Sequence, residues 1–410
     1  MGADSRPRVL MLTSTLPRWH GDAEPRFVLD LAQSLKNDFH IELIAPHTRG
    51  AQKNEHLEGI PVTRYRYWWP RWQAIAYQGG MAQRLRGNPL RLLQLPFFFT
   101  ALIVTITRRL RRQPAISLIH AHWLIPQGLA AVIARRLSGS AVPILCTSHG
   151  GDLHGLRGPL LTRIKRWVLS SCDDFTVVSH AMVDVARGIA ADTTPRVIPM
   201  GTDLRERFTP PEKARIPPLN HLIFVGRLVP KKGVEFLLKA MARLRKSHPD
   251  ITLDVVGHGP LSDELQRQAE SWDMAQQVRF VGPVPHEHLA KYYQAAGIAV
   301  FPFIEASDGD QEGFGLVMVE AMGCGCGVIA SDLPAVRDVI QTGANGTLVP
   351  PGQAEALANA IVAAIEDPQE TRAMAKQARA TAIEKFDWHS IGDRFKKVYE
   401  SLIGPEEASR

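Results

Sequence analysis

Two glutamates that flank a glycine-rich, apolar stretch are the residues in this chain whose types and spacing most clearly suggest chemistry. Residues 312–320 read EGFGLVMVE, so Glu312 and Glu320 lie about 12 Å apart if the whole stretch is helical. At that separation, one carboxylate can bind a sugar while the other binds a ribose across a diphosphate. Glutamates on a helix usually form a solvated face, but these apolar flanks would make Glu320 a costly buried charge without a ligand.

The backbone between the two glutamates is suited to the same kind of ligand. Gly313 and Gly315 carry no side chain that would keep a ligand away from the main chain. Free amides in this segment can therefore bind a sugar hydroxyl or a phosphate, and they belong to Gly313, Phe314, Gly315 and Leu316.

A second candidate segment is basic. Residues 226–233 read GRLVPKKG, and they follow an apolar strand pattern and precede a helical one. Ligands of open parallel sheets bind where such loops enter helices, because the amide ends of helices favour anions. Arg227 can hold phosphate oxygens with its planar guanidinium group, and Lys232 adds a point charge; the alternative is a solvent-exposed basic loop. The segment is not a GxxxxGK[ST] loop, and no GxGxxG follows the first expected strand.

Short apolar runs alternate with helical patterns along the chain, which predicts parallel sheets with crossover helices. A proline-rich linker at 210–218 separates two series of expected strands: 8–13, 40–45, 116–120, 144–148, 175–179 and 196–199, then 221–225, 252–256, 278–281, 298–302 and 328–330. The fold class is therefore α/β, with two Rossmann-like, doubly wound domains. We expect an N-terminal domain over residues 1–203 and a C-terminal domain over 204–385. A last helix around Phe386–Leu402 is expected to cross back, so that residues 386–410 join the first domain.

The net charge of +7 is unevenly distributed. Residues 1–200 carry 25 Lys+Arg against 13 Asp+Glu, whereas residues 201–410 carry 23 against 28. Aromatic residues are interleaved with arginines from Arg64 to Trp72 (RYRYWWPRW), which favours an anionic partner over a merely solvated basic surface. A membrane surface or a phosphorylated acceptor fits this pattern. No nucleic-acid partner is expected, because no recognised nucleic-acid module accompanies the patch.

The longest apolar run, residues 92–107, is followed closely by four arginines. It is shorter than the roughly 20 residues that a spanning helix needs, and Gln94 and Pro96 interrupt it. Its second half is expected to be a buried crossover helix, while its first half could enter a bilayer interface. The polar start MGADSRPR and the lack of a disulfide framework predict a cytoplasmic protein. The apolar run, with the aromatic and basic residues beside it, predicts peripheral attachment to the inner face of the plasma membrane.

Several motifs, in this order, resemble the retaining glycosyltransferase family 4 (glycosyl transferases group 1) over nearly the whole chain. They are IHAHW at 119–123, HGGD at 149–152, VIPMGTD at 197–203, GRLVPKKG at 226–233, VVGHGPL at 255–261 and the E-x7-E pattern of residues 312–320. The resemblance implies the GT-B fold, in which two Rossmann-like domains face a central cleft. It also implies transfer of a hexosyl group from a UDP- or GDP-sugar to an acceptor hydroxyl. The expected acceptor is a lipid-linked or phosphorylated glycan in polysaccharide or glycolipid synthesis.

The resemblance also implies roles for the donor-binding candidates. Arg227 and Lys232 would bind the donor diphosphate, and Glu320 would bind the ribose hydroxyls. Glu312 would hold the donor sugar near its anomeric carbon, together with the backbone of residues 313–316. No carboxylate is placed by the sequence as a covalent nucleophile, in contrast to the paired carboxylates of a retaining glycosidase.

Three further roles rest on the resemblance alone. His149 would make a polar contact with the reacting sugar, the backbone near Val284 would meet the base, and Gly21 would make room for phosphate or acceptor. The loop that holds Gly21, LPRWHGDAEPR, departs from the family pattern, because it has one glycine where many relatives have a pair. Position 258 is His where relatives often have Asp, which we interpret as a tolerated substitution in a turn.

Several metal-like patterns are interpreted as structural. Asp308 and Asp310 spell a DxD sequence but precede EGFG in a GT-B-like chain, so a solvated loop is favoured. Cys324 and Cys326 lack a second pair for zinc and are expected to pack. The pairs His120/His122 and His286/His288 have no identifiable carboxylate or Cys partner, so His120 is interpreted as a strand-end residue and His286 and His288 as helix-start residues. Asp152 is interpreted as either an acceptor contact or a cap. No metal and no cofactor other than the nucleotide sugar is expected.

Two other functions fit the same fold class. One is a non-catalytic sugar-nucleotide-binding protein, which the joint presence of His149, Arg227, Lys232, Glu312 and Glu320 argues against. The other is a sugar-nucleotide epimerase, which would need an acid–base pair around the sugar and would act without an acceptor. Donor hydrolysis or transfer in vitro distinguishes these alternatives.

Overall fold

The computed structural model describes residues 6–22, 24–77, 81–155, 158–212, 216–307 and 309–404. The chain forms two compact units. The first contains the described residues up to Val178, Met182–Met200 and those from Ile391 onward, and the second contains Ser179–Ala181 and Gly201–Ser390. The chain thus leaves the first unit near residue 200, against the expected limit of 203, and returns to it at 391, against the expected 386.

The first unit is built on a sheet with the strand order β3-β4-β2-β1-β5-β6-β7-β8. All neighbours pair in parallel except β3 and β4. The strands are β1 (Arg8–Leu12), β2 (His40–Pro46), β3 (Asn54–Leu57), β4 (Ile60–Tyr65), β5 (Leu118–His122), β6 (Ile144–Ser148), β7 (Asp174–Val177) and β8 (Arg196–Val197). The sequence patterns did not predict β3 and β4, because the outward side chains of this short antiparallel pair are polar.

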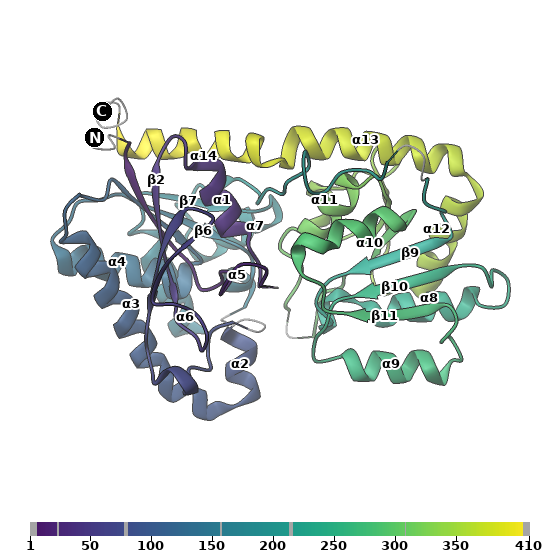
Figure 1. Ribbon diagram of the computed structural model, residues 1–410, viewed down its shortest axis with the longest axis horizontal. Helices are drawn as coiled ribbons and strands as arrows, with labels where there is room; N and C mark the ends of the chain where they lie inside the picture. Colours follow the sequence, from purple (N-terminus) through teal and green to yellow (C-terminus); the bar gives the residue numbers. More distant parts are fainter. Residues whose placement is uncertain are drawn as a thin grey trace. The chain divides into compact units, whose positions relative to one another are not determined.

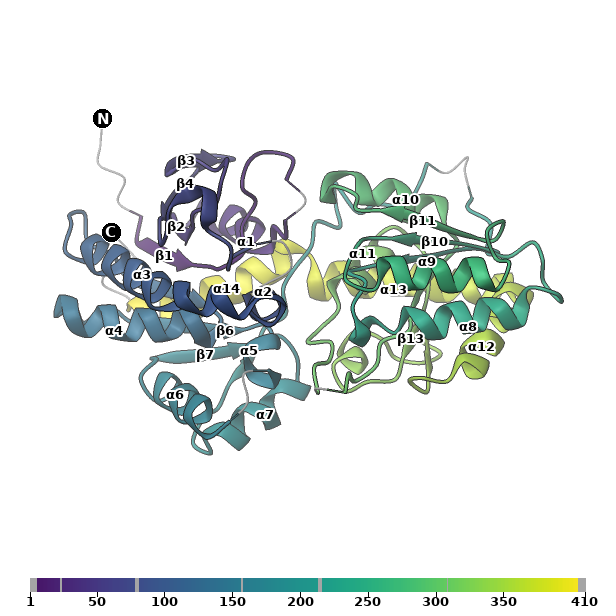
Figure 2. The ribbon, with the colours of Figure 1, turned by 90° about the horizontal axis from the view of Figure 1, so that it is seen from below.

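Figure 1 shows the helices of this unit around the sheet. They are α1 (Phe27–Leu35), α2 (Met81–Gly87), α3 (Leu95–Leu110), α4 (Leu129–Ser138), α5 (Gly151–His154), α6 (Pro159–Leu169) and α7 (Ala181–Ile189), with short 3-10 turns at Pro70–Trp72 and Pro89–Gln94 and a π-helical turn at Leu124–Gly128. In α3, Phe98, Leu102 and Ile106 are fully buried at intervals of four residues, so one face of the helix belongs to the core. Figure 2 shows α3 lying alongside α4.

The second unit contains an all-parallel sheet with the order β11-β10-β9-β12-β13-β14. Its strands are β9 (His221–Val225), β10 (Thr252–Val256), β11 (Val278–Gly282), β12 (Ile298–Phe301), β13 (Gly327–Ser331) and β14 (Thr347–Val349). Its helices are α8 (Val234–Leu244), α9 (Ser262–Ser271), α10 (Leu289–Ala295), α11 (Leu316–Gly323), α12 (Ala354–Glu366) and α13 (Pro368–Phe386). The strands β9, β12 and β13 are almost entirely buried, as the inner strands of a doubly wound sheet require.

Each sheet has one point where the strand order reverses. In the first unit this point lies between β1 and β5, and in the second it lies between β9 and β12. Ligands of open parallel sheets bind outside the carboxyl ends of the strands at such a point. The segments GRLVPKKG and EGFG follow β9 and β12, respectively.

The last helix, expected around Phe386–Leu402, is α14 (Trp388–Ile403), and Asp387 separates it from α13. The Asp387 carboxylate accepts hydrogen bonds from the amides of Leu204 (3.2 Å) and His389 (3.1 Å), so it fastens this break to the second unit. Beyond residue 390, α14 belongs to the first unit, where Phe395 and Tyr399 are fully buried.

The interpretation of Arg64–Trp72 as one basic, aromatic surface is only partly right. Arg64 is completely buried, and it donates hydrogen bonds to the Glu55 carboxylate (2.5 Å), the Tyr77 hydroxyl (2.7 Å) and the Pro17 carbonyl (2.6 Å). Tyr65 and Tyr67 are buried as well. The start of the segment is the core strand β4, and the exposed residues follow it.

Candidate functional site

The two loops at the switch point of the second unit are joined by their backbones. The Ile304 amide donates to the Lys231 carbonyl at 2.9 Å. Gly233 has a positive φ of 62°, and a Cβ atom there would lie 1.8 Å from the Pro302 carbonyl oxygen. Only glycine permits this approach. The loop after β9 is therefore pressed against the end of β12.

Lys232 and Glu312 meet between these loops. Lys232 Nζ lies 2.6 Å from Glu312 Oε2 and 4.5 Å from the centre of the Phe303 ring. Burial raises the pKa of Glu312, but the positive charges of Lys232 and Lys231 outweigh this effect and hold its pKa below the ordinary value. The structure thus brings one predicted phosphate-binding cation to the predicted sugar-binding carboxylate, which it keeps ionised.

Arg227 is the second residue after β9 and shares its loop with Lys232. The loop is fixed by the VVGHGPL segment: the Gly226 amide donates to the Val256 carbonyl (3.0 Å), and the Leu228 amide donates to the His258 carbonyl (3.2 Å). His258 makes this contact through its backbone carbonyl, so the contact does not depend on the side chain at this position. The half-buried Arg227 therefore lies at the switch point on a constrained backbone.

Helix α11 carries Glu320 but not Glu312. Gly315 has a φ of 88°, a left-handed conformation that starts the helix at Leu316. The uniform helical spacing considered for Glu312 and Glu320 is therefore wrong. Glu312 lies in the preceding loop, and residues 313–316 form the entry to α11, where amides lack helical partners.

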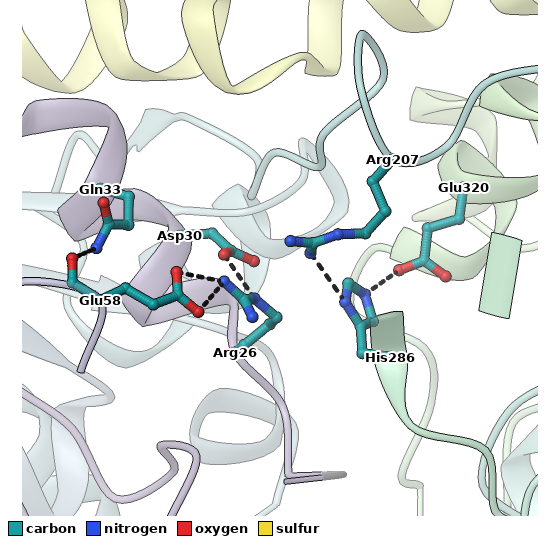
Figure 3. A network of polar contacts seen from close by, with 7 residues as sticks. All are labelled: Arg26, Asp30, Gln33, Glu58, Arg207, His286 and Glu320. Atoms are coloured by element: carbon teal, nitrogen blue, oxygen red, sulfur yellow. Dashed lines mark hydrogen bonds and ion pairs between the residues drawn. The ribbon is translucent and has the colours of Figure 1, made fainter. Parts of the chain in front are cut away.

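Glu320 is a buried carboxylate with two hydrogen-bond donors. His286 Nε2 lies 3.0 Å from Oε1, and the Tyr293 hydroxyl lies 3.1 Å from Oε2. An Arg207 nitrogen lies 3.2 Å from His286 Nδ1 (Figure 3). Because arginine can only donate, Nδ1 accepts and the proton on Nε2 points to Glu320. This chain of contacts orients the carboxylate.

Sequence reasoning missed Arg207, His286 and Tyr293 in this role. His286 does start a 3-10 turn, His286–His288, as expected, but its ring belongs to the Glu320 network. These residues are 27 to 113 positions away from Glu320, so no local pattern could identify them. The half-buried Val284 lies two residues before His286, which ties the loop after β11 to Glu320.

In the first unit, His149 follows β6 and lies among aromatic rings. The centres of the Trp123, Phe27 and His122 rings are 4.8, 4.9 and 5.3 Å from that of His149. His122 Nδ1 is 3.0 Å from His149 Nε2. Burial lowers the pKa of His149 to about 3, so this ring is neutral near pH 7.

The hydrogen bond between the two histidines couples their tautomers, because one of the two nitrogens must donate and the other must accept. His122 Nε2 is buried and meets no hydrogen-bond partner in the described part of the chain. A buried N–H without an acceptor is rarer than a buried acceptor without a donor, so the His122 proton is assigned to Nδ1. Nδ1–H then donates to His149 Nε2, and the His149 proton is on Nδ1. His149 can therefore offer an N–H to a neighbouring oxygen.

His120 does not contribute to an open site, because it lies inside β5. Its Nδ1 is 2.6 Å from the Tyr399 hydroxyl, and its Nε2 is 2.7 Å from the Thr147 hydroxyl. Burial, followed by the influence of His149, lowers the pKa of His120 to about 3. The contact with Tyr399 joins α14 to the sheet.

Asp152 and Gly21 occupy different surroundings. The Asp152 carboxylate accepts hydrogen bonds from the Ser148 hydroxyl (2.6 Å) and the Leu124 amide (2.7 Å), so it fastens the loop after β5 from inside the unit. Gly21 is exposed in the loop after β1, with a φ of 77°. That loop is held by three hydrogen bonds from Arg18 to the Asp22 carboxylate.

A separate ionic network fixes the start of α1. Arg26 is bound to Asp30 at 2.7 Å and to Glu58 at 2.9 Å, and Gln33 donates to the Glu58 carbonyl at 2.8 Å (Figure 3). Glu58 is in the turn between β3 and β4. The network therefore anchors α1 to this turn, and its contacts are structural.

The metal-like patterns are distributed as follows. Asp308 lies outside the described residues, and Asp310 is paired with Lys231 at 3.1 Å. Cys324 and Cys326 are buried free thiols, in agreement with a packing role. Within the described ranges, no group of three or more His, Cys, Asp or Glu side chains is arranged to hold a metal ion.

Comparison with known proteins decides the family. Residues 25–206 match the model described as Glycosyltransferase Family 4, and residues 207–381 match Glycosyl transferases group 1, so the two models together span most of the chain. The chain belongs to glycosyltransferase family 4. It is therefore a glycosyltransferase, and the sequence-based prediction of the enzyme class is confirmed.

Two curated relatives of this family 4 enzyme are mannosyltransferases. It is 27% identical over 352 residues to the GDP-mannose-dependent alpha-(1-6)-phosphatidylinositol monomannoside mannosyltransferase of Mycolicibacterium smegmatis, with 83% of this chain and 90% of the relative covered. It is 35% identical over 208 residues to the phosphatidyl-myo-inositol mannosyltransferase of Mycobacterium leprae, with 50% of this chain and 53% of the relative covered.

Solved structures support the GT-B fold. The sucrose-phosphate synthase of Thermosynechococcus elongatus superposes with a TM-score of 0.75 at 25% identity, covering 97% of this chain and 99% of that one. HepE of Anabaena, solved in complex with UDP and glucose, has a TM-score of 0.71 at 20% identity and covers 97% and 100% of the two chains. At 20% identity, the similarity to HepE shows a shared fold alone. The predicted fold class is confirmed.

Proposed function

We propose that this family 4 enzyme transfers a hexosyl group from a nucleoside-diphosphate sugar to an acceptor hydroxyl, with retention of the anomeric configuration. The observation that carries the proposal is the contact of Lys232 with Glu312, where the loops after β9 and β12 meet at the switch point. A cation suited to phosphate thus lies beside a carboxylate suited to sugar hydroxyls.

In this proposal, departure of the nucleoside diphosphate is assisted by fixed positive charge. Arg227, Lys232 and the amides of residues 313–316 stabilise the charge that develops on the leaving phosphate. Lys232 then exchanges part of its contact with Glu312 for a phosphate oxygen. A phosphate oxygen accepts the acceptor's hydroxyl proton on the same face of the sugar, so no metal ion is required.

Glu312 and Glu320 have different proposed tasks. Glu312 accepts hydrogen bonds from donor sugar hydroxyls and holds the anomeric carbon in place. Glu320 accepts hydrogen bonds from the ribose hydroxyls, and the loop at Val284 contacts the base through its backbone. His286 and Tyr293 support this assignment because they orient the Glu320 carboxylate.

Glu320→Gln is expected to weaken donor binding by about 10- to 100-fold, the range typical of a hydrogen bond to a charged group, while kcat changes much less. The amide preserves the shape and can still bond to His286 and Tyr293. Donor titration by calorimetry and steady-state kinetics measure the two effects. Glu287→Gln, which alters an exposed carboxylate beside His286, is the control. Equal affinities for wild type and Glu320→Gln would exclude Glu320 from the ribose site.

We propose that His149 uses its Nδ1–H as a donor to the reacting sugar and that His122 is a positioning residue. His122→Leu removes the donor to His149 Nε2, whereas His122→Asn keeps an N–H near the position of Nδ1. The leucine variant is expected to lose at least about tenfold in kcat, because the wrong His149 tautomer becomes populated, and the asparagine variant is expected to retain most of it.

Nitrogen-15 NMR of the His149 ring tests this expectation directly, because it reports which ring nitrogen carries the proton. Wild type and His122→Asn should show protonation at Nδ1, and His122→Leu should shift toward Nε2. Equal losses of kcat in both variants with an unchanged His149 tautomer would contradict the positioning role.

The proposed acceptor is a lipid-linked or phosphorylated glycan, and the proposed location is the cytoplasmic side of the membrane. The basic first half of the chain is compatible with a phosphorylated acceptor. The two mannosyltransferase relatives are named for phosphatidylinositol-based acceptors. GDP-mannose, the donor in the name of one of them, is the first donor to test.

The experiment is incubation of the enzyme with GDP-mannose, UDP-glucose and other nucleotide sugars, with and without polyprenyl-phosphate- or phosphatidylinositol-linked glycans. Release of nucleoside diphosphate identifies the donor, and the anomeric proton coupling of the product reports its configuration. An inverted product would refute retention. Undiminished turnover after exhaustive chelation is expected, and its loss with restoration by Mg²⁺ or Mn²⁺ would refute the metal-independent mechanism.

A further inference from the structure

Large apolar side chains are exposed together in the first unit. Six of them are more than half exposed, and they come from the segment between β4 and the first turn of α3: Trp69, Trp72, Leu90, Leu92, Leu93 and Phe97. We call these six residues the Trp69–Phe97 surface. Such exposure is costly in water, and a patch of this kind on a soluble domain commonly marks an interaction site.

Ring contacts and a hydrogen bond connect the parts of this surface. The Trp69 ring is 5.9 Å from Trp72 and 5.5 Å from Trp68, and Trp68 is 4.8 Å from Phe97. The Gln94 side chain donates to the Trp72 carbonyl at 2.9 Å, which holds the 3-10 turn Pro89–Gln94 against the segment that carries the tryptophans. The exposed side chains therefore belong to one surface, which these contacts hold in place.

This surface is anchored to the folded unit. The run Pro89–Leu110 is long and apolar enough to cross a membrane by length and composition alone. Its residues Phe98, Leu102 and Ile106 are nevertheless fully buried against the domain. On the outward face of α3, the exposed side chains change along the helix from apolar, at Phe97 and Val104, to basic, at Arg108. A helix of this kind can place one face on a membrane surface while its other face stays in the core of the protein.

The sequence segment that carries the surface has charges of one sign. Residues 59–151 contain twelve arginines and no lysine, aspartate or glutamate. Arg66, Arg71, Arg108 and Arg112 are exposed, and the Arg71 guanidinium lies 4.5 Å from the centre of the Trp72 ring. Tryptophan and arginine together suit the headgroup region of a bilayer, where one part of each side chain is apolar and the other meets phosphate.

We propose that the Trp69–Phe97 surface docks the enzyme on an anionic lipid bilayer, with the apolar side chains in the interface and the arginines at the lipid phosphates. A second copy of the chain is a poorer occupant, because it would bring two arginine-rich, acid-free segments together. This inference goes beyond the transfer reaction and does not depend on which donor or acceptor is used.

Vesicle sedimentation with the full chain tests the proposal. Vesicles of phosphatidylcholine alone are compared with vesicles in which roughly 30% of the lipid is phosphatidylglycerol, which is anionic. Trp69→Ala/Trp72→Ala and Leu93→Glu are each expected to reduce partitioning to the anionic vesicles by about tenfold or more. Arg66→Gln is expected to reduce it by about fivefold, an effect that should diminish in high salt.

Two substitutions in the same unit serve as matched controls. Leu160→Glu changes a leucine at the start of α6 that is as exposed as Leu93, and Arg163→Gln removes an exposed arginine on the same helix. Both are expected to bind vesicles as wild type does. Nucleoside-diphosphate release from the soluble donor should be unchanged in every variant, which separates a failure of docking from a failure of folding or of the proposed reaction.

Several results would overturn the proposal. They are wild-type partitioning that is equal on neutral and anionic vesicles, equal losses for Leu93→Glu and Leu160→Glu, or unchanged binding by the double tryptophan variant. A lipid-free wild type that is dimeric by sedimentation velocity, with a monomeric Trp69→Ala/Trp72→Ala variant, would assign the surface to self-association instead.

Discussion

Lys232→Met is expected to lower kcat by about 100- to 1,000-fold, the range for loss of a single preorganised group that stabilises transition-state charge. Lys232 Nζ is held between the Glu312 carboxylate and the Phe303 ring, so it is already in place before a donor binds. The loss should appear mainly in kcat, because the phosphate charge grows as the sugar bond breaks. Steady-state kinetics with saturating acceptor measure it.

The same substitution has a pH-dependent effect on stability. In the wild type, the pKa of Glu312 is lowered, so the ion pair contributes stability above the unfolded pKa of glutamate, about 4.3, and loses it as pH falls through the folded pKa. Without Lys232, burial becomes the larger influence and raises the folded pKa. The variant should then lose stability as pH rises, so its deficit relative to wild type should be larger at pH 7 than at pH 4.

A double variant separates stability from catalysis. Lys232→Met/Glu312→Gln removes both charges, and it should recover much of the stability at pH 7 without recovering activity. Lys239→Met, on α8 of the same unit, is the control for loss of a lysine. If Lys232→Met retained wild-type kcat while its stability fell, Lys232 would be a structural partner of Glu312 and not a phosphate ligand.

Glu312→Ala is expected to reduce kcat by about 100-fold while the KM for the donor changes only a few fold. The carboxylate is kept ionised by Lys232 and Lys231, and it precedes the amides at the entry to α11. Its proposed task is to place the donor sugar, so its loss should allow binding in unproductive positions. Initial rates at several donor concentrations separate the two parameters.

Glu305→Ala is a suitable comparison for Glu312→Ala, because Glu305 is an exposed carboxylate in the same loop after β12. It should leave both parameters near wild-type values. A Glu312→Ala enzyme with normal turnover would remove Glu312 from the reaction, whereas a large rise in KM with an unchanged kcat would make it a ground-state binding residue.

The strands could be predicted from the sequence where the apolar pattern was strong. The strands β6, β9 and β10 begin and end at the expected residues, because short, mostly apolar runs are typical of buried parallel strands. The β3–β4 pair carries a weaker pattern and was missed. Its presence explains why Arg64, which has the composition of a surface residue, is buried beside Glu55 and Tyr77.

The histidines show a different limit. His149 was named through a motif resemblance, but nothing in the spacing of IHAHW and HGGD predicted that His122 would bond to its ring. The side chains meet because β5 and β6 are neighbours in register, with His122 opposite Thr147. Pairing between strands is a long-range property, and a periodic pattern within one strand does not report it.

The sequence by itself determined the two-domain α/β class, the enzyme family and the loops after β9 and β12 as places for chemistry, because these depend on local patterns and on motifs in order. Tertiary structure alone decided that Lys232 contacts Glu312, that Arg207, His286 and Tyr293 serve Glu320, and which aromatic residues of the basic segment reach solvent. The physical reason is that these outcomes depend on which strands are neighbours and on which side chains the core can accommodate. Both are settled only when residues far apart in the chain are packed together.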